Sequence, residues 1–252
     1  MDLSLEGRSA IITGGSSGIG RATAEAFARE GCNVGICARG EEGVEEAVSV
    51  LEGMGVRAFG RALDVANADA LESWVDDAAE ALGGLDVVVA NVSALGSGEG
   101  EEAWRRAIEV DLMHTVRTVN AALPYLRESD AGSIVIVSTV SARHARGAQP
   151  YGTLKAALNH YGKGLAVELA PEGIRANVVS PGTIYVEDGF WGNVERNAPE
   201  AFDEALSNNP MGRMGKPEEV ARSIVFLGSP ASSFTSGTNL LVDGAITPGV
   251  QL

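Results

Sequence analysis

The sequence predicts an α/β fold built around a parallel sheet, and three observations support that prediction. Short apolar runs alternate along the chain with amphipathic stretches long enough to form helices, which is the pattern of repeated strand–helix–strand units. A glycine-rich stretch at residues 14–20 lies where the first apolar run meets the first amphipathic stretch. The 252 residues, 45% hydrophobic and 21% charged, suit a globular domain with a large core. We therefore expect residues 1–252 to form a single domain.

Seven segments are predicted to be strands, because each is a short apolar run bounded by glycine or polar residues. They are residues 9–13, 32–38, 57–63, 86–90, 134–137, 174–180 and 239–243. Helices are predicted between them, at residues 21–30, 44–51, 68–82, 101–127, 151–170 and 217–227. Residues 96–100 are expected to form a loop.

The longest predicted helix, residues 101–127, carries an apolar stripe at helical spacing that we expect to face the core. Its members are Trp104, Ile108, Leu112, Val116, Val119 and Leu123. Asp111 interrupts the stripe with a carboxylate that can point inward. The helix is therefore expected to bring one acidic group toward the interior.

A long irregular segment is predicted from Pro181 to Pro210. Loops of this length in compact domains are usually functional or disordered. Its aromatic and acidic residues are Tyr185, Glu187, Asp188, Phe190 and Trp191. Two interpretations remain open for residues 183–210: a lid over a substrate, or a surface excursion whose aromatic rings pack into the core.

Composition opposes several classes of function. The net charge of −15 disfavours nucleic-acid or anionic-membrane partners, because phosphate groups are held by lysine and arginine. No apolar run reaches the roughly 18 residues that a membrane helix needs. Residues 1–6 have neither the basic region nor the apolar core of a signal peptide. We therefore expect a cytoplasmic protein with no nucleic-acid or membrane partner.

The cysteines and histidines predict neither a disulfide nor a metal site. Cys32 and Cys37 have odd spacing in one predicted strand and would point to opposite faces, which fits a reduced compartment. His114, His144 and His160 show no metal-ligand spacing with cysteine. No metal is therefore expected.

The glycine-rich stretch predicts a site for a phosphate group. It reads Gly14-Gly15-Ser16-Ser17-Gly18-Ile19-Gly20 and joins the first predicted strand to the first predicted helix. Backbone N–H groups and the positive helix end attract an anion, and glycines let a pyrophosphate approach the main chain. Nucleotide binding is therefore expected here in preference to a plain tight turn.

Arg39, just after the second predicted strand, favours NADP(H) over NAD(H). An acidic residue at this position would accept hydrogen bonds from the adenosine ribose, whereas Ala38 followed by Arg39 would accommodate and pair a 2′-phosphate. A solvated arginine at a strand end is the alternative, and NAD(H) remains the second option.

Tyr151 and Lys155 lie four residues apart at the start of a predicted helix. Such residues share a helix face with Cβ atoms roughly 5–6 Å apart, so the ammonium can lie beside the phenol. Lowering a tyrosine pKa from near 10 to neutrality takes about 3 units, or roughly 4 kcal/mol. The phenol could then exchange a proton with a substrate oxygen. Taken alone, the pair also fits a ring on the core and a lysine in water.

Polar residues follow the third, fourth and fifth predicted strands. They are Asp64-Val65, Asn91-Val92-Ser93 and Ser138. Open α/β sheets bind their ligands at the carboxyl ends of the strands. These residues are therefore expected to line a ligand site.

Nearly the whole chain resembles the short-chain dehydrogenase/reductase (SDR) family. The residues that carry the resemblance are Thr13-Gly14-x-x-x-Gly18-Ile19-Gly20, Asp64-Val65, Asn91, Ser138, Tyr151-x-x-x-Lys155, Pro181-Gly182 and Leu241-Val242-Asp243-Gly244. The resemblance implies a doubly wound Rossmann sheet of seven strands with helices on both faces, commonly in a homotetramer. It also implies an oxidoreductase that transfers a hydride between NADP(H) and a small carbonyl or secondary-alcohol substrate.

The resemblance implies roles for individual residues. Ser138 would hydrogen-bond the substrate oxygen and Tyr151 would move its proton. Lys155 would lower the pKa of Tyr151 and bind the nicotinamide ribose. Asp111 stands where the family has an asparagine that anchors a proton-relaying water, so we expect an altered relay. The expected cofactor-binding residues are Gly14, Ser16, Ser17, Gly18, Ile19, Gly20, Arg39, Asp64, Val65, Asn91, Tyr151, Lys155, Pro181, Gly182 and Ile184.

Two more departures from the family pattern concern cofactor geometry. Asn91 is followed by Val92 and Ser93 in place of the usual alanine and glycine, which puts side chains where close packing is expected. Val186 replaces the usual threonine and removes a hydroxyl near the cofactor.

Substrate identity stays open between several classes. Arg143, His144 and Arg146 would suit an acidic carrier protein, as in a 3-oxoacyl-thioester reductase, although the net charge of −15 opposes that encounter. Glu187, Asp188 and Trp191 suit a sugar or polyol, and a flat apolar ketone also fits. A protein of another class, which binds NADP(H) without catalysis, is the further alternative.

Overall fold

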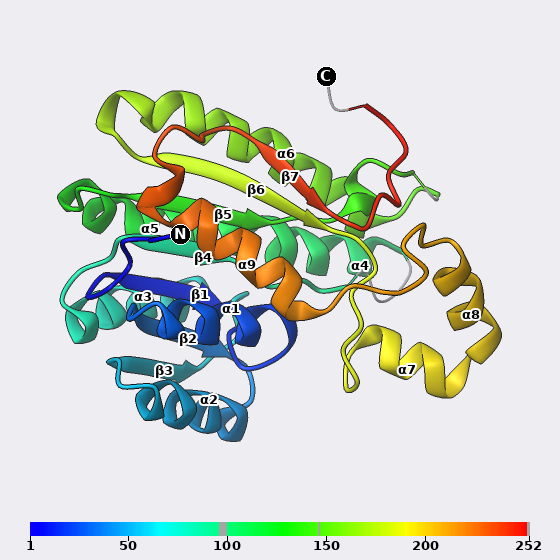
Figure 1. The fold of residues 1–252 in the computed structure, drawn as a ribbon, viewed down its shortest axis with the longest axis horizontal. Helices are drawn as coiled ribbons and strands as arrows, with labels where there is room; N and C mark the ends of the chain where they lie inside the picture. Colours follow the sequence, from blue (N-terminus) through cyan, green and yellow to red (C-terminus); the bar gives the residue numbers. More distant parts are fainter. Residues whose placement is uncertain (96–99, 146, 251–252) are drawn as a thin grey trace.

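The computed structural model describes residues 1–95, 100–145 and 147–250. Seven parallel strands form one sheet in the order β3-β2-β1-β4-β5-β6-β7 (Figure 1). Their bounds are Ser9–Thr13, Asn33–Ala38, Ala58–Ala62, Val87–Ala90, Ser133–Val137, Arg175–Pro181 and Asn239–Val242 for β1 to β7. The predicted parallel sheet is confirmed, and every predicted strand lies within one residue of its observed bounds.

The strand order has a switch point between β1 and β4. From β1 the chain builds outward through β2 to β3, and it then returns to place β4 on the other side of β1. Connections leave neighbouring strands in opposite directions there, which opens a crevice at their carboxyl ends. Thr13 and Asn91 stand at those two ends.

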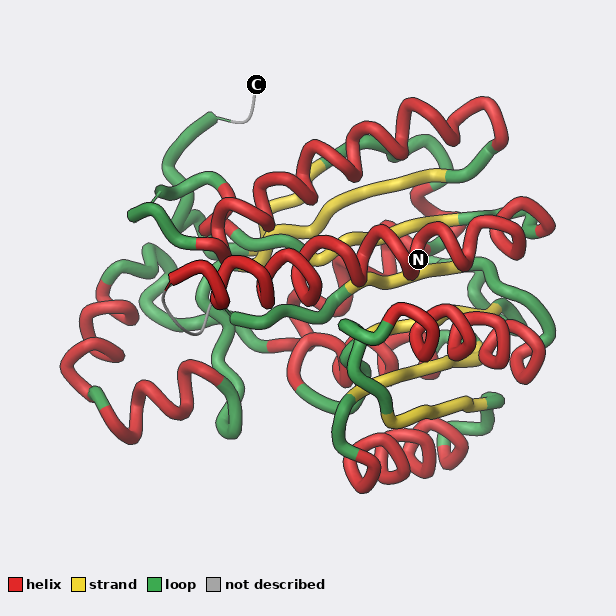
Figure 2. Tube along the Cα trace, turned by 180° about the vertical axis from the view of Figure 1, so that it is seen from behind, coloured by secondary structure: helices red, strands yellow, loops and turns green. Residues whose placement is uncertain are grey.

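Helices cover both faces of the sheet, as Figures 1 and 2 show from opposite sides. Their bounds are Gly18–Arg29, Glu41–Gly53, Ala68–Leu82, Gly100–Ala107, His114–Glu128, Pro150–Leu169, Phe190–Asn197, Pro199–Ser207 and Pro217–Gly228 for α1 to α9. Neighbouring residues on β1 point to opposite faces: Ile11 packs with α3, α5 and α6, and Ile12 with α1, α2 and α9. Alternate side chains of buried strands thus build two separate apolar layers.

The prediction of one continuous helix over residues 101–127 is wrong, because the helix is interrupted. A π-helical turn, Ile108–Met113, separates α4 from α5. The wider turn shifts the 3.6-residue period, so Ile108 of the predicted stripe is 38% exposed while Val119 is buried. Asp111 within this turn and His114 directly after it are completely buried.

The segment predicted to be irregular contains two short helices, α7 and α8, which stand out from the carboxyl ends of the strands in Figure 1. Proline at the first helical position of α8 fixes its backbone angle for a helix start. The aromatic rings pair locally, Tyr185 edge-on with Phe202 and Phe190 edge-on with Trp191. Because Phe190 is 55% exposed, these rings are not all packed into the core.

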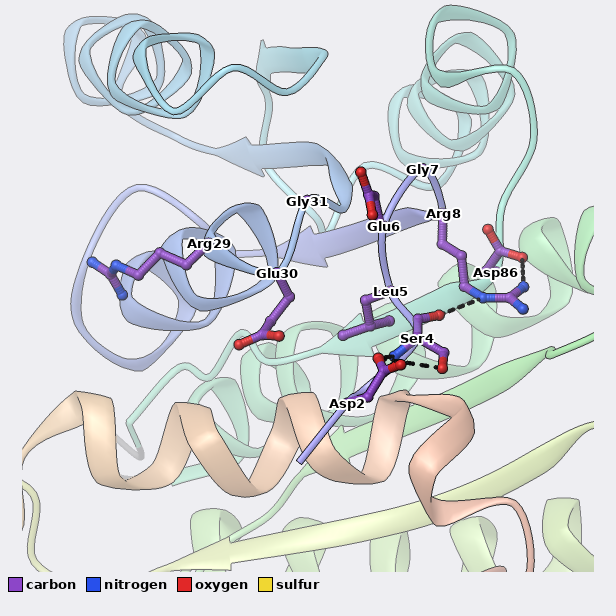
Figure 3. A pocket seen from close by; sticks show the side chains of 10 residues that line it. All are labelled: Asp2, Ser4, Leu5, Glu6, Gly7, Arg8, Arg29, Glu30, Gly31 and Asp86. Atoms are coloured by element: carbon purple, nitrogen blue, oxygen red, sulfur yellow. Dashed lines mark hydrogen bonds and ion pairs between the residues drawn. The ribbon is translucent and has the colours of Figure 1, made fainter.

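A hollow of about 880 Å³ opens at the other end of the sheet, beside the amino ends of β1, β2 and β4 (Figure 3). Arg8 crosses it, donating from Nε to the Ser4 carbonyl at 2.9 Å and from Nη1 to Asp86 at 3.1 Å. The ion pair with Asp86 ties Arg8 to the start of β4, and the hydrogen bond to Ser4 holds the preceding residues against it. Over the described parts of the chain, no helix is long and apolar enough to span a membrane.

Candidate active site

The glycine-rich turn forms an open cradle at the end of β1. Gly14 and Gly18 have φ of 71° and 52°, a region that favours glycine. A side chain on Gly20 would come within 2.0 Å of the Gly14 carbonyl oxygen. The turn leads into α1 at Gly18, so helix N–H groups and bare backbone face the same space. That combination fits a pyrophosphate.

Arg39 and Ser16 lie on the same side of this turn. Arg39 is exposed between β2 and α2, and it makes no ion pair within the described residues. Ser16 packs against the first turn of α2, where a side chain on Gly43 would lie 3.6 Å from its Cβ. A free arginine and a hydroxyl beside the cradle suit a phosphate group on an adenosine ribose.

The ends of β3 and β4 supply the next part of the wall. Asp64 is exposed and accepts from the Ala66 amide at 3.0 Å, while the Val65 side chain is buried in the core. Asn91 donates from its side chain to the Thr13 carbonyl at 3.1 Å and from its backbone to Thr13 Oγ1 at 3.0 Å. Asn91 therefore lies at the switch point against Thr13, whereas Asp64 and Val65 follow the edge strand β3.

Ser138 and Lys155 meet between β5 and α6. The Ser138 hydroxyl donates to the Lys155 carbonyl at 3.1 Å, and its side chain is only 4% exposed. Lys155 Nζ donates to the carbonyls of Val137 at 3.0 Å and Val92 at 3.3 Å. The amine is thus fixed against the ends of two neighbouring strands.

Asp111 and Lys155 form a buried ion pair. Lys155 Nζ lies 3.7 Å from Asp111 Oδ1, and the two side chains are 2% and 0% exposed. Burial lowers the pKa of Lys155, and the charge of Asp111 opposes that change. The residue that departs from the family pattern therefore acts directly on the lysine.

The expectation that Lys155 lowers the pKa of Tyr151 is not met in this structure. Burial raises the pKa of Tyr151, and the charge of Asp111 raises it further, whereas a hydrogen bond with the Thr139 side chain lowers it. Tyr151 is therefore a protonated phenol at neutral pH.

The remaining predicted cofactor residues and the two valine departures follow the carboxyl ends of β4 and β6. Pro181 ends β6, and Gly182 donates to the Val242 carbonyl at 3.0 Å. Ile184 bridges to Gly215. Two valines at departures from the family pattern pack against the glycine turn: Val92 Cγ2 lies 3.0 Å from where a Gly14 side chain would begin, and Val186 Cγ2 lies 3.7 Å from that position on Gly18.

Two polar residues at this site were not predicted from the sequence. Thr139 follows Ser138 and acts on Tyr151 through a hydrogen bond. His114 is fully buried, with Nε2 3.4 Å from Thr13 Oγ1. Its spacing of three residues from Asp111 was a usable signal, because such residues share a helix face. Across the described ranges, no group of three or more acidic, histidine or cysteine side chains could hold a metal ion.

A family model described as enoyl-(acyl carrier protein) reductase matches residues 14–247. Isoepoxydon dehydrogenase patN of Penicillium expansum is 41% identical over 252 residues, covering 98% of this chain and 97% of that protein. The chain belongs to the SDR family. Members of this family are oxidoreductases that act on alcohol or carbonyl groups. This protein is therefore an oxidoreductase of that kind.

Two other relatives help to describe the family match. Glucose 1-dehydrogenase 2 of Bacillus subtilis is 34% identical, with 96% of each chain covered. The crystal structure of L-sorbose reductase from Gluconobacter frateurii, complexed with NADPH and L-sorbose, has a TM-score of 0.91 and 32% identity, covering 99% of this chain and 100% of that one. The SDR fold is thus matched over its full length.

Proposed function

We propose that this SDR protein uses NADP(H) to interconvert a carbonyl and a secondary alcohol on a small, hydroxylated, sugar-like substrate. The observation that supports the proposal is the contact of Ser138 with Lys155 between β5 and α6, with Tyr151 in the first turn of the same helix and the glycine cradle at the end of β1. Relatives named for glucose and L-sorbose support the substrate class.

The residues present fit NADP(H). The glycine turn, with Ser17 and Ile19, would hold the pyrophosphate, and Ser16 and Arg39 the 2′-phosphate. Asp64 and Val65 would flank the adenine and Asn91 the ribose, with Pro181, Gly182 and Ile184 along the nicotinamide side. Bound there, the cofactor supplies or accepts the hydride.

The chain's own residues would handle the proton. Ser138 would hydrogen-bond a substrate oxygen in the crevice, which would stabilise charge that develops on that oxygen. Tyr151, held as a phenol by burial and by Asp111, donates its proton to that oxygen during carbonyl reduction. Lys155, fixed by Val92 and Val137, would face the nicotinamide ribose.

The segment at residues 183–210 is proposed as the substrate lid. It contains α7 and α8 and follows β6 at the carboxyl end of the sheet. Exposed Glu187 and Asp188 can accept hydrogen bonds from substrate hydroxyls, and the half-buried ring of Trp191 can stack on a sugar face. These side chains favour a polyhydroxylated substrate over a flat apolar ketone.

We further propose that the protein is one domain, acts in the cytoplasm and forms a homotetramer. The two cysteines are buried and unpaired, and burial raises the pKa of both thiols, which suits a reduced compartment. The fully exposed Phe234 and the 69% exposed Val167 support subunit contacts. Light scattering behind size exclusion would measure the assembly, and a monomeric mass would contradict it.

A 3-oxoacyl-thioester reductase is the second candidate. It is favoured by the family model's acyl-carrier-protein description and by a hollow of about 300 Å³ lined by Arg143, His144 and the first turn of α6. Arg146, the third basic residue of that predicted patch, lies outside the described residues. Activity on acyl thioesters above that on polyols would select this candidate.

The main test is a substrate panel with Tyr151→Phe. Sugars, cyclic hydroxyketones, 3-oxoacyl thioesters and apolar ketones are assayed with NADPH and NADH, and their alcohols with the oxidised cofactors. We expect turnover of hydroxylated substrates to fall about 1000-fold in Tyr151→Phe, because general acid–base catalysis contributes roughly 10²–10⁴-fold. Tyr125→Phe, a half-buried tyrosine whose phenol donates to Asp76, is the matched control.

Absence of turnover by the wild-type protein across the panel, together with tight NADPH binding, would favour the non-catalytic alternative. Equal turnover by Tyr151→Phe and wild type would remove the tyrosine from the mechanism.

Arg39→Ala tests the cofactor preference. Losing a charge-assisted contact to the 2′-phosphate should weaken NADPH binding about 10–100-fold and leave NADH binding within about twofold. Fluorescence titration measures both affinities, with Arg222→Ala, an exposed arginine on α9, as control. Equal losses for both nucleotides would mean that Arg39 does not read the phosphate.

A further inference from the structure

Two buried polar side chains at the π-helical turn, Asp111 and His114, act on one short segment, residues 91–94, the first directly and the second through Thr13. Asp111 lies within the turn and His114 directly follows it, and both are 0% exposed. Residues 91–94 connect the end of β4 to the crevice at the switch point. Asp111 contacts this segment directly, and His114 reaches it through Thr13.

Asp111 holds the far end of the segment. Its two carboxylate oxygens accept from the Ala94 amide at 3.3 and 3.4 Å. Lys155, the ion-pair partner of Asp111, donates to the Val92 carbonyl at 3.3 Å. This end of the segment is therefore coupled to the proton-transfer residues.

The near end of the segment depends on Thr13, which is 0% exposed. Its hydroxyl oxygen accepts from the Asn91 amide at 3.0 Å, and its carbonyl accepts from the Asn91 side chain at 3.1 Å. His114 Nε2 lies 3.4 Å from the same hydroxyl oxygen. Thr13 thus fixes Asn91 in both backbone and side chain, and His114 is the group behind Thr13.

The imidazole of His114 is costly where it lies. Burial lowers its pKa to about 3, with the charge of Lys155 acting in the same direction and the Val110 carbonyl opposing it. Its Nδ1 makes no hydrogen bond of normal geometry within the described residues. A buried polar atom without a partner reduces stability, and an apolar ring of similar size would avoid that cost. Its contact with Thr13 distinguishes the imidazole from a packing residue.

We propose that His114 is a positioning residue for the cofactor: it orients the Thr13 hydroxyl, which in turn fixes Asn91 in the crevice. A hydroxyl that accepts the Asn91 amide still has one proton to donate, and a neutral imidazole accepts it at Nε2. The chain of donors then runs from Asn91 through Thr13 to His114. The inference rests on the proposed function, since it assumes that NADP(H) binds beside Asn91.

His114→Phe is the first test, because it keeps an aromatic ring and removes the acceptor. We expect the dissociation constant for NADPH to rise about tenfold, the loss of one net hydrogen bond, while kcat changes less than KM. The melting temperature should stay equal or rise, since the unpartnered nitrogen is gone. His160→Phe, an exposed histidine on α6, is the matched control.

Two amide variants distinguish a role of His114 as a hydrogen-bond acceptor at the Nε2 position from a role in packing alone. The glutamine amide of His114→Gln reaches about as far as imidazole Nε2, whereas the shorter amide of His114→Asn reaches only about as far as Nδ1. We expect His114→Gln to bind NADPH within about threefold of wild type and His114→Asn to resemble His114→Phe. In the double variant with Thr13→Val and His114→Phe, the loss of NADPH affinity should be smaller than the sum of the two single losses. Both substitutions interrupt the same chain of hydrogen bonds.

NADPH binding within twofold of wild type in His114→Phe would overturn the proposal and make His114 a packing residue. If His114→Phe does not fold, the comparison of His114→Gln with His114→Asn decides: equal affinities overturn the proposal. Wild-type binding of NADPH without turnover would contradict the proposed activity alone. Wild-type failure to bind either nucleotide would contradict both.

Discussion

Two buried cations stand at opposite ends of the sheet and are held in different ways. Arg175, at the amino end of β6, donates to the carbonyls of Leu227 at 2.6 Å, Ser229 at 3.0 Å and Gly228 at 3.3 Å, and to Ser232 Oγ at 2.6 Å. Lys155, near the carboxyl end of β5, has two carbonyl contacts of 3.0 and 3.3 Å and a carboxylate at 3.7 Å.

The difference separates a structural cation from a functional one. Arg175 meets the carbonyls at the end of α9, the negative end of the helix, and its short bonds use the fixed fork of the guanidinium. Burial lowers the pKa of Arg175 to about 10, so it stays charged at neutral pH. Lys155 has longer contacts beside Asp111, whose charge acts on its pKa, and its own charge acts on the pKa of His114. We therefore expect changes at Arg175 to affect stability and changes around Lys155 to affect chemistry.

The largest expected effect is on stability at Arg175. Replacing it in Arg175→Leu leaves several buried carbonyls without a donor and should reduce the free energy of unfolding by about 3 kcal/mol. Urea unfolding measures this loss, and turnover at low temperature should stay within about twofold. Arg175→Lys keeps the charge but lacks the forked guanidinium. We expect its free energy of unfolding to lie between those of the wild type and Arg175→Leu. A large loss of activity in folded Arg175→Leu would contradict the distinction between a structural cation, Arg175, and a functional one, Lys155.

A smaller effect is expected in the acid stability that His114 controls. The pKa of His114 is about 3 in the folded protein and near 6.5 when unfolded. Between these values the unfolded chain binds more protons, so stability falls as pH decreases through this window. From pH 6.5 to 5 this group alone should cost roughly 2 kcal/mol.

Urea titrations of wild type and His114→Gln at pH 5 and pH 7 measure this contribution as a difference. The glutamine variant lacks the titrating group, so its loss between the two pH values should be smaller. Equal losses in the two proteins would show that His114 protonates freely in the folded state, contrary to its burial.

The smallest expected effect is a shift in the pH profile of Asp111→Asn. The Asp111 charge raises the pKa of Tyr151, so its removal lowers that pKa. Alcohol oxidation needs the phenolate, and its rate should therefore reach its plateau about one pH unit lower in Asp111→Asn. Turnover at neutral pH should be retained or raised. An unchanged profile would mean that Asp111 acts on Lys155 alone, and a collapse of activity would assign the carboxylate another role.

The sequence by itself determined the parallel sheet, the glycine turn and the positions of Ser138, Tyr151 and Lys155. Strands β1 to β7 were predictable because each is a local apolar run with polar ends. Such a run favours a buried strand whatever its neighbours in the fold are. The glycine positions were predictable because positive φ and close approach are requirements of the backbone itself.

Only the tertiary structure decided how charge is distributed around those residues. The sequence predicted that Asp111 can point inward, but that Asp111 pairs with Lys155 and that His114 lies against Thr13 are contacts between distant segments, which only the folded chain shows. The direction of the Tyr151 pKa depends on burial and on a carboxylate forty residues away along the chain. Electrostatic interactions act through space, and their size depends on exclusion of water, which the order of residues does not specify.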